Sequence, residues 1–478
     1  MNQVIDAPEA YQEKTKDYFD KIAKTRHLSK AKNWYYYKKV TEYLKSIIPA
    51  NYNVLEIGSG DGDLLKALEP QRGLGLDASQ EFVNIAKQKH SNLEFRQGFA
   101  ETTSVAEKFD YIVLSNLVGY LHDAQQSFEQ LHAASQPHTR IVIHYYNYLW
   151  EPFLKLGEWL GLKLKQGEQN WLTLDDLKNL LDIAGFETIK KYKKILFPFY
   201  IPIISNFINR WIANLPIINS LCLSEFIIAR PKPRLPLNKP SVSIMIPTKD
   251  ESGNIQELLE RIPVFPCDME VIVVDGKSID GTQAEVQKAI ERFPEKNIKL
   301  LDQGDTKGKG PAVRIGFDAC KGDILMILDS DISVAPEDTP KFYHQLVAGN
   351  GEMINGTRLV YPMEKRAMRF LNMLANHFFG KAFSYLLDQR LRDTLCGTKA
   401  LFRSDYQKIV RNRAFFGDFD PFGDFDLLFG AAKLNLRIIE IPVRYYERRY
   451  GDIKIHRFRH GLLLIGMCAI ALRKLKFT

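Results

Sequence analysis

The sequence predicts an α/β protein built from two domains. The chain has 478 residues, well beyond the ~150 of an ordinary domain. Two regions, 30–195 and 241–450, each alternate short apolar runs with helical segments, which is typical of a parallel sheet covered by helices. A proline-dense stretch, 231–240, separates them and should be extended and stiff. We therefore expect domains at 1–230 and 241–453, with a tail at 454–478.

The bulk composition restricts the partners of the chain. Its net charge of +8 favours anionic partners such as phosphates and acidic lipid headgroups. Nucleic acid is not expected, because no aromatic and basic recognition motif is present. The five cysteines match no zinc spacing, and we expect reduced thiols. The sequence shows no signal sequence and no apolar run near the ~20 residues that span a bilayer. We therefore expect a cytoplasmic location, with peripheral contact at the inner face of the membrane as a further option.

Residues 1–50 are predicted to form two amphipathic helices, the second of which carries the aromatic run 34–37. Such a run is typical of a packing surface. Helices that precede a nucleotide-binding sheet are also placed to cover its pocket.

A glycine-rich turn follows the first predicted strand, at residues 53–62. Gly58, Gly60 and Gly62 would let the backbone approach a ligand at a helix N-terminus. Their spacing differs from the GxGxxG of dinucleotide sites, and residue 63 is Asp. The nearby carboxylates, which would disfavour a pyrophosphate but tolerate a cationic sulfonium, are Glu56, Asp61 and Asp63.

The next strand ends at Asp77, whose carboxylate is placed to accept both hydroxyls of a ribose. With the glycine turn and the strand 109–116, this region resembles the class I S-adenosylmethionine-dependent methyltransferases. The resemblance covers about residues 30–195 and implies a Rossmann-like fold with a seven-stranded sheet. Phe99 stands where the family often has an acidic residue near the adenine. The residues that the resemblance assigns to S-adenosylmethionine are Glu56, Gly58, Gly60, Gly62, Asp77 and Asn116. A generic Rossmann-like domain for another nucleotide stays the alternative.

The methyl acceptor is not indicated by the sequence. A reactive nucleophile would need only alignment with the methyl group. A hydroxyl acceptor would need a base, and His122, Asp123 and His144 are the nearby candidates, although each is also typical of a structural role. A binding module without catalytic activity is the alternative for this domain.

Residues 195–223 form an aromatic and apolar insertion, expected between the last two strands of the first sheet. Pro198, Pro202 and Pro216 argue against one straight spanning helix. Two interpretations stay open: packing against the second domain, or lying in a membrane interface.

The second domain is organised around the apolar run 324–328, which ends in Asp329 and Asp331. Strand alternation sends both carboxylates to one side, at the carboxyl end of a buried strand. Two carboxylates there suit Mg²⁺ or Mn²⁺, which would neutralise a diphosphate leaving group. The same Asp-Ser-Asp sequence is also ordinary turn chemistry.

Four segments in order make residues 241–450 resemble the family 2 glycosyltransferases of the GT-A fold. They are the acidic turn after the first strand, the strand end at Asp275, the basic segment 307–312 and the Asp-x-Asp pair. Gly276 stands where many members have a second Asp. The resemblance implies inverting transfer from a nucleotide-diphosphate sugar and a metal at Asp329 and Asp331. The residues it assigns to the nucleotide sugar are Pro247, Asp250, Glu251, Asp275, Lys307, Lys309 and Asp329.

The downstream segments 356–358, 393–399 and 437–451 resemble the dolichyl- or polyprenyl-phosphate hexose synthases, although Lys399 stands where Arg is commoner. A prenyl phosphate is already anionic, so it needs positioning more than deprotonation. Arg358 and Arg369 are the candidates for this role. A sugar hydroxyl of a glycan acceptor would instead need a carboxylate base, for which Asp424 and Asp426 are the candidates.

The tail contains an apolar run, 462–472, between basic residues. It is too short to span a bilayer and suits an interfacial helix on anionic lipid, with a buried helix as the alternative. Together these features predict a bifunctional enzyme that transfers a hexose to a polyprenyl phosphate at the membrane surface and a methyl group to an unknown acceptor.

Overall fold

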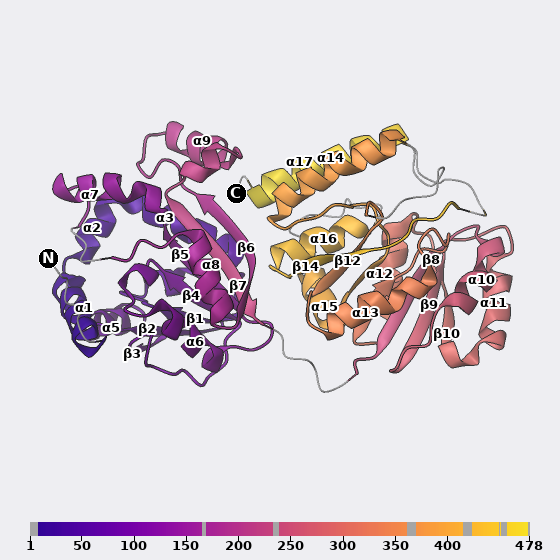
Figure 1. The fold of residues 1–478 in the computed structure, drawn as a ribbon, viewed down its shortest axis with the longest axis horizontal. Helices are drawn as coiled ribbons and strands as arrows, with labels where there is room; N and C mark the ends of the chain where they lie inside the picture. The colour runs from indigo at the N-terminus through magenta and orange to yellow at the C-terminus, as the bar shows by residue number, and fades with distance from the viewer. Residues whose placement is uncertain are drawn as a thin grey trace. The chain divides into compact units, whose positions relative to one another are not determined.

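The computed structural model describes residues 8–164, 169–232, 239–360, 370–413, 423–448, 450 and 457–476. The chain divides into two compact units, Met1–Lys232 with Lys476–Thr478, and Pro233–Leu475. Figure 1 shows the fold of each, and the two units are described separately.

The first unit is built on a seven-stranded sheet in the order β3-β2-β1-β4-β5-β7-β6. The first five strands in this order are parallel, β7 runs against β5, and β6 runs against β7. The strands are β1 (Asn53–Ile57), β2 (Arg72–Asp77), β3 (Glu94–Gln97), β4 (Tyr111–Ser115), β5 (Arg140–Tyr146), β6 (Phe186–Lys194) and β7 (Ser224–Pro231). This confirms the predicted α/β fold with a seven-stranded sheet.

Helices pack on both faces of this sheet, because successive residues of its buried strands point to opposite sides. Leu55 and Ile57 belong to one apolar core, and Val54 belongs to the other. The helices that follow the first strand are α4 (Asp63–Ala67), α5 (Gln80–Lys89), α6 (Ala124–Ala134), α7 (Glu151–Trp159), α8 (Leu174–Ile183) and α9 (Ile204–Arg210).

Three helices, rather than the predicted two, precede the first strand: α1 (Pro8–Ala23), α2 (Arg26–Lys32) and α3 (Trp34–Ile47). The break that the prediction missed lies at Asn33, whose side-chain amide donates to the Ser29 carbonyl at 3.2 Å. Asparagine competes in this way with the backbone hydrogen bonds of a helix. The aromatic run therefore begins the third helix. As predicted for it, Tyr35 and Tyr36 are buried.

The apolar insertion 195–223 connects β6 to β7, as predicted, and contains α9 with the short 3₁₀ helices η3 (Ile212–Asn214) and η4 (Ile218–Leu221). Because β6 is antiparallel to β7 and β7 to β5, the carboxyl ends of β6 and β5 lie at the same edge of the sheet. The insertion therefore leaves the sheet at the edge where β1 enters its glycine turn.

The second unit has another seven-stranded sheet, in the order β10-β9-β8-β11-β13-β12-β14. Only β13 runs against its neighbours. The strands are β8 (Val242–Thr248), β9 (Met269–Asp275), β10 (Ile298–Asp302), β11 (Ile324–Ile327), β12 (Met353–Thr357), β13 (Lys399–Phe402) and β14 (Ile438–Pro442). The carboxyl ends of six strands and the beginning of β13 thus meet at one edge.

Apolar cores cover both faces of this sheet too, with Met245 in one and Ile244 and Ile246 in the other. The helices are α10 (Ser252–Arg261), α11 (Thr282–Arg292), α12 (Lys309–Ala319), α13 (Thr339–Val347), α14 (Phe370–Leu387), α15 (Arg403–Arg411), α16 (Asp424–Lys433) and α17 (Arg457–Ala471).

The predicted tail forms α17, which lies beside α14 (Figure 1). Leu464, Met467 and Ala471 are buried in the core of the second unit, whereas Leu463 and Ile465 are exposed. One face of the helix is thus a core element, so membrane contact, which stays a prediction, would have to use the other face. Among the described residues, no helix combines the length and apolar character needed to cross a bilayer.

Candidate functional sites

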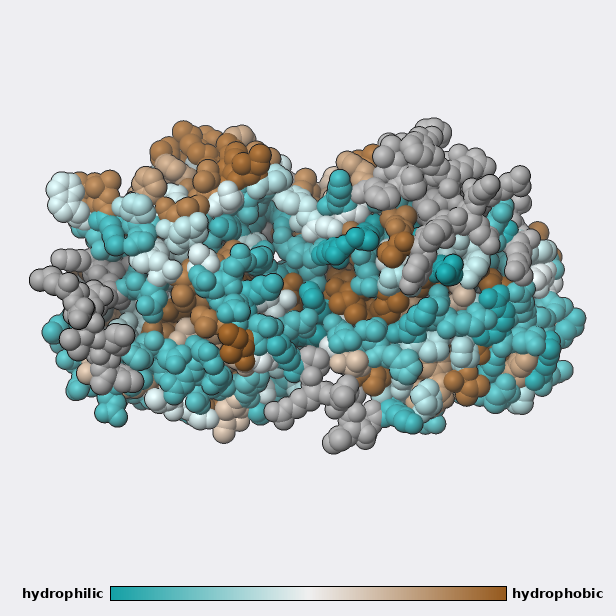
Figure 2. All heavy atoms as spheres, in the orientation of Figure 1, coloured by the Kyte–Doolittle hydropathy of each residue, from teal (hydrophilic) through white to brown (hydrophobic). Residues whose placement is uncertain are grey.

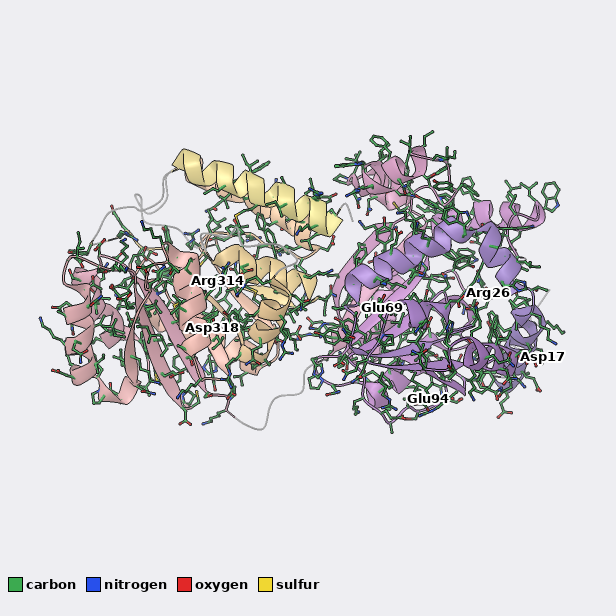
Figure 3. The ribbon with its side chains drawn as sticks, turned by 180° about the vertical axis from the view of Figure 1, so that it is seen from behind. Asp17, Arg26, Glu69, Glu94, Arg314 and Asp318 are labelled. Carbon is green, nitrogen blue, oxygen red and sulfur yellow. The ribbon has the colours of Figure 1, made fainter. Side chains whose placement is uncertain are left out.

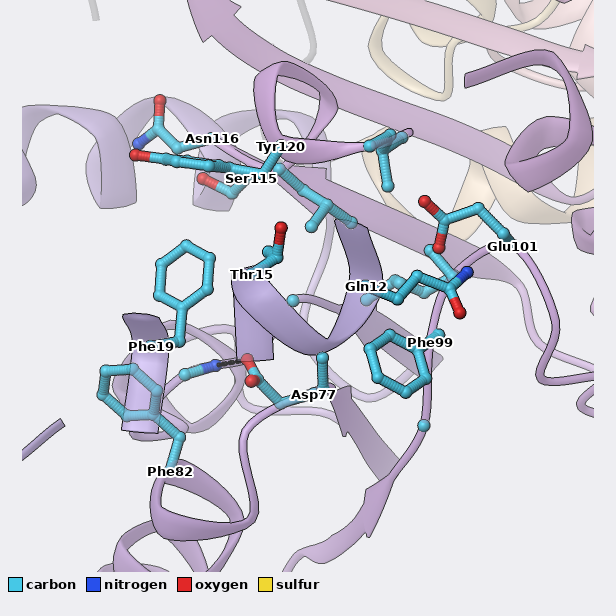
Figure 4. A pocket seen from close by; sticks show the side chains of 18 of the residues that line it. Gln12, Thr15, Phe19, Asp77, Phe82, Phe99, Glu101, Ser115, Asn116 and Tyr120 are labelled. Carbon is cyan, nitrogen blue, oxygen red and sulfur yellow. Dashed lines mark hydrogen bonds between the residues drawn. The ribbon is translucent and has the colours of Figure 1, made fainter. Parts of the chain in front are cut away.

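A cavity opens at the carboxyl ends of β1, β2 and β4 in the first unit. Its volume is about 880 Å³ when space open to solvent is included. Helix α1 contributes Tyr11, Gln12, Thr15 and Phe19 to its lining, so the N-terminal segment covers the pocket (Figure 4).

The glycine turn after β1 shapes one wall of this cavity. Gly58 and Gly60 line it, and Gly58, Gly60 and Gly62 all have positive φ, at 75°, 52° and 76°. A Cβ added to Gly60 would meet no heavy atom within 4 Å. The turn therefore leaves empty space where a side chain would otherwise project, which is the arrangement that a ligand close to the backbone needs.

Asp77 stands at the end of β2 with its carboxylate in the cavity wall. Its Oδ2 accepts from the Gly60 amide at 2.7 Å, drawn as a dashed line in Figure 4, and its Oδ1 accepts from the Ser79 amide at 2.9 Å. Burial raises the pKa of Asp77, and the two backbone hydrogen bonds oppose the rise. A carboxylate has about four lone-pair positions, so capacity remains for a ribose.

Asn116 follows β4 and also lines the cavity. Its backbone lies in the left-handed region, with φ of 54°, and its buried Oδ1 accepts no hydrogen bond from the described residues. A buried acceptor without a partner is costly. An ammonium or amide donor of a ligand would satisfy it.

The carboxylates around the cavity differ in role. Glu56 is buried behind the glycine turn and is not part of the lining; burial raises its pKa well above the usual value. Phe99 lines the cavity, and so does Glu101, two residues later (Figure 4). Glu101 Oε1 accepts from the His122 amide at 3.0 Å. The sequence comparison missed Glu101 because the expected acid was sought at position 99.

The three candidate bases lie outside the cavity lining. Asp123 caps α6 by accepting from the Gln126 amide at 2.9 Å, and the His122 ring packs edge-on against Tyr11 at 5.3 Å. His144 is fully buried; its Nδ1 lies 3.0 Å from Ser115 Oγ and its Nε2 lies 3.2 Å from Ser224 Oγ. Each has a structural role in this arrangement.

His144 gives a testable pH dependence, because burial lowers its pKa to about 3. Below the unfolded value near 6.5, only the unfolded chain takes up this proton, so stability should fall by up to about 1.4 kcal/mol per pH unit down to about pH 3. His144→Gln should be less stable at pH 7, and the difference should shrink as the pH falls to 4.5. Urea unfolding at several pH values measures this.

The control for His144 is Val142→Ala, which removes buried volume from the same strand, β5, but no titratable group. Its stability difference from the unaltered protein should stay nearly constant across the same pH range. A constant difference for His144→Gln as well would contradict the buried neutral imidazole.

Several pocket residues come from helices far from the glycine turn in sequence. Arg26 of α2, labelled in Figure 3, lines the cavity. Among the described lining residues it is the one with a cationic side chain. Tyr120 and Tyr146 add aromatic walls. The sequence indicated that the N-terminal helices could cover the pocket as a lid, because they precede the sheet. The amphipathic periodicity of these helices could not show which of their residues face a ligand.

In the second unit, Asp329 and Asp331 lie just beyond the carboxyl end of β11, as predicted. Each carboxylate is paired with a cation of the chain. Lys309 Nζ lies 2.7 Å from Asp329 Oδ1, and Arg448 Nη2 donates to Asp331 Oδ2 at 2.7 Å. Burial alone would raise the pKa of Asp331, but the Arg448 guanidinium outweighs burial and holds the pKa below its usual value.

Local structure explains how these cations reach the acids. Gly308, with φ of 97°, ends the basic loop, and Lys309 is the first residue of α12. An antiparallel bridge between Val334 and Tyr445 places the segment with Arg448 beside Asp331. Lys307 of the same loop is exposed, which leaves it accessible to an anionic ligand.

The segment that precedes β13 also reaches this acidic pair. A Cβ added to Gly397 would overlap the Asp329 carboxylate and lie 2.5 Å from Lys309 Nζ. A larger residue here would force the Asp329 carboxylate and the Lys309 ammonium to shift. The 393–399 segment, which carries part of the resemblance to the hexose synthases, thus lies against the predicted metal residues.

The acids at the ends of β8 and β9 hold loops together. Asp275 is fully buried and accepts from the Ser278 amide at 3.0 Å and from Gln283 Nε2 at 2.7 Å. Asp250 Oδ1 accepts from the Ile279 amide at 2.9 Å, and Glu251 Oε2 accepts from Asn254 at 2.7 Å. Pro247 accepts from Ser330 Oγ at 3.1 Å. Nucleotide-sugar contacts by these residues stay predictions.

Arg358 is engaged inside the protein. Its Nε and Nη2 donate to the two oxygens of buried Asp393 at 2.7 and 2.8 Å, and its guanidinium lies 4.8 Å from the centre of the Tyr445 ring. Asp393 uses two of the five N–H donors of the guanidinium, so a contact with an acceptor phosphate would have to come from Nη1 or from the second hydrogen of Nη2. Arg369, the other candidate, lies outside the described residues.

Of the two candidate bases, Asp426 is described and Asp424 only as the first residue of α16. Arg413 Nε donates to Asp426 Oδ2 at 2.8 Å, and Arg314 Nη2, from α12 (Figure 3), lies 3.5 Å from the same oxygen. The start of α16 lies near the basic loop, since a Cβ at Gly423 would be 2.9 Å from Gly310 Cα. The paired state of Asp426 favours a structural ion pair over a base.

The donor set restricts how a divalent ion could bind. Among the described residues, no cluster of three or more His, Cys, Asp or Glu side chains could hold a metal. Two carboxylates alone fit Mg²⁺ or Mn²⁺ when substrate phosphates and water complete the coordination, the usual arrangement for Mg²⁺.

Two family models match the chain, one on each unit. The model described as "Methyltransferase domain" matches residues 22–191, and that described as "Glycosyl transferase family 2" matches residues 243–415. The chain joins a methyltransferase domain to a family 2 glycosyl transferase domain. Both predicted family memberships are confirmed.

Curated relatives resemble the glycosyl transferase half. Undecaprenyl-phosphate 4-deoxy-4-formamido-L-arabinose transferase of Edwardsiella ictaluri is 29% identical over 222 residues, which are 45% of this chain and 62% of the relative. Dolichol-phosphate mannosyltransferase of Pyrococcus furiosus is 33% identical over 121 residues, 25% of this chain and 33% of the relative. The chain thus spans only part of the length of each.

Among solved structures, glucosyl-3-phosphoglycerate synthase of Mycobacterium tuberculosis, in complex with Mn²⁺ and uridine diphosphate, is 18% identical. The match covers 49% of this chain and 80% of that chain, with a TM-score of 0.36. A likeness at this level carries no conclusion about activity.

Proposed function

We propose that the glycosyl transferase domain transfers a hexose from a nucleotide-diphosphate sugar to a polyprenyl phosphate at the membrane surface, with a divalent ion held by Asp329 and Asp331. The observation that carries this proposal is the convergence of the acidic pair, Lys309, Arg448 and the Gly397 segment at one sheet edge. The names of the curated relatives support a lipid-phosphate acceptor.

When bound, the divalent ion would neutralise charge on the diphosphate leaving group. The chain's own cations would assist. Lys309 and Arg448, which pair with the two acids at 2.7 Å, would share in neutralising the diphosphate of a bound donor. An acceptor oxygen then forms a bond to the anomeric carbon while the bond to the diphosphate breaks, and the nucleoside diphosphate leaves with the electron pair.

The acceptor can be a phosphate without a base, because its oxygen is already anionic. The ion pairs of Asp426 with Arg413 and Arg314 support this choice over a sugar hydroxyl. The glycan hydroxyl stays the second candidate, with Asp424 as its base. A panel of nucleotide sugars, assayed with undecaprenyl phosphate and with soluble glycans, separates the two.

We propose that the methyltransferase domain binds S-adenosylmethionine in the cavity beneath α1. The bound cofactor would supply an electrophilic methyl group. The residues fit such a ligand: Gly60 leaves open space, Asp77 can accept from the ribose, Asn116 has an unsatisfied acceptor and Arg26 can pair with a carboxylate. Methyl-label transfer into lipid and sugar extracts tests activity, since a domain that only binds would transfer none.

Gly60→Ala tests the fit with a matched control. Gly161 has a similar positive φ of 69°, and its Cβ would also meet nothing within 4 Å, but it does not line the cavity. Both substitutions should cost about 1 kcal/mol of stability through backbone strain. Only Gly60→Ala should weaken S-adenosylmethionine binding, by roughly tenfold or more in calorimetry, because its methyl group enters the ligand space. Equal affinities would argue against this location.

A further inference from the structure

The insertion between β6 and β7 has its polar side chains inside and its apolar side chains outside. Ser205 and Asn209 are 0% and 1% exposed, whereas Ile203 and Ile217 are 84% and 86% exposed. Asn209 holds the turn, since its side-chain amide donates to the Phe197 carbonyl at 2.7 Å and its Oδ1 accepts from the Phe197 amide at 2.9 Å. A segment folded against water alone shows the reverse distribution.

Helix α7 extends this exposed apolar surface. Phe153, Leu156 and Trp159 are 64%, 52% and 81% exposed. Trp150 Nε1 donates to the Leu221 carbonyl at 2.8 Å, which ties the start of α7 to the insertion. We call the exposed apolar side chains of α7 and residues 199–217 the apolar face. Figure 2 shows such side chains gathered over α9.

The apolar face lies at the same edge of the sheet as the cavity of the first unit. The insertion follows the carboxyl end of β6, and α7 follows that of β5, at the same sheet edge as the glycine turn. Tyr146, the last residue of β5, lines the cavity. Trp34, at the start of α3, packs against Tyr200 of the insertion with ring centres 5.0 Å apart.

The composition of this region favours a bilayer as the partner. Residues 188–224 contain five Lys or Arg and no Asp or Glu, and they are rich in Phe, Tyr, Trp, Ile and Leu. Arg210 is exposed within the apolar face, whereas Lys191 and Lys193 pair with Asp175 and Glu225. Aromatic and aliphatic side chains flanked by cations are typical of segments that lie in the headgroup region of an anionic bilayer.

We propose that the apolar face docks on an anionic lipid bilayer and holds the mouth of the methyl-donor cavity at its surface, so that the methyl acceptor is a lipid-anchored molecule. The acceptor part of this proposal rests on the proposed binding of S-adenosylmethionine, but the docking does not. The fold holds the face rigidly through buried Asn and Ser side chains, so docking needs no refolding.

Flotation of the full-length protein with phosphatidylglycerol vesicles tests the docking. The double variant Ile203→Glu, Ile217→Glu should lower the vesicle partition coefficient by roughly 30-fold, because two exposed apolar groups become charged in the interface. Ile183→Glu is the matched control and should leave it unchanged. Ile183 is 55% exposed and ends α8, which leads into the amino end of β6 at the opposite sheet edge.

Quenching of tryptophan emission by brominated phosphatidylglycerol reports this face even if the other half of the chain also binds lipid. The double variant Trp159→Phe, Trp211→Phe should lose the part of the quenching that these two side chains contribute and keep the partition coefficient, while Trp34, which packs against Tyr200, remains a reporter. Unchanged quenching would overturn the proposal. The proposal would also be overturned if the glutamate variant floated as well as the unaltered protein but had a changed Stokes radius or oligomeric state. In that case a second copy, or the other half of the chain, would cover the face. Calorimetry with S-adenosylmethionine on the same samples shows separately whether the cofactor assignment fails.

Discussion

Asp331→Asn should lower sugar transfer by roughly a thousandfold or more, because it removes a charge from the predicted metal pair where the leaving diphosphate must be neutralised. It also leaves Arg448, now 2.7 Å from the carboxylate, without that charged partner. Asp331→Ala should abolish transfer. Affinity for S-adenosylmethionine should be unchanged in both, since the cofactor cavity is built by the other unit. A radiolabelled sugar assay with Mg²⁺ or Mn²⁺ measures the first effect, and calorimetry the second.

The control is Asp338→Asn, which removes a carboxylate whose ion pair among the described residues is local, with Lys341 at 2.6 Å, in the helical turn η6 (Pro336–Asp338). It should retain transfer within about twofold. Asp329→Asn should resemble Asp331→Asn, and the double variant should lose little more, because residues that act as a unit are not additive. Transfer by Asp331→Ala that persists with added Mg²⁺ or Mn²⁺ would refute the metal assignment.

The acidic pair could be predicted because the evidence was local. An apolar run of strand length fixes where Asp329 and Asp331 lie relative to a sheet edge, whatever the rest of the chain does. The glycine turn and Asp77 are local in the same sense. The partners of these residues could not be predicted. Arg448 is 117 residues away from Asp331, and it reaches the acid through the bridge between Val334 and Tyr445.

Pairing in the folded state also changes what a predicted residue can do. Arg358 was selected as a free cation for a phosphate, yet Asp393 occupies two of its nitrogens. The sequence shows that a charged side chain is present, but it does not show whether that side chain forms an ion pair with a buried opposite charge. The same applies to Asp426, and to the lid, where periodicity alone could not show which side of α1 faces the cavity.

Asp77→Asn should weaken S-adenosylmethionine binding by roughly 100-fold, because hydrogen bonds to a charged acceptor contribute about 1.5–3 kcal/mol each and two ribose hydroxyls would lose it. Binding by the unaltered protein should also weaken as the pH falls, since burial raises the pKa of Asp77 and a protonated carboxyl accepts poorly. The variant should lack this pH dependence. Asp110→Asn is the control, because Asp110 likewise accepts from a backbone amide, that of Asn53 at 3.0 Å, but at the amino end of β1. If Asp77→Asn bound the cofactor as tightly as Asp110→Asn does, the ribose would not lie at Asp77. The pH titration then adds independent evidence, because a purely structural loss would weaken binding equally at every pH, whereas a lost charged acceptor should matter most where the native carboxyl is ionised.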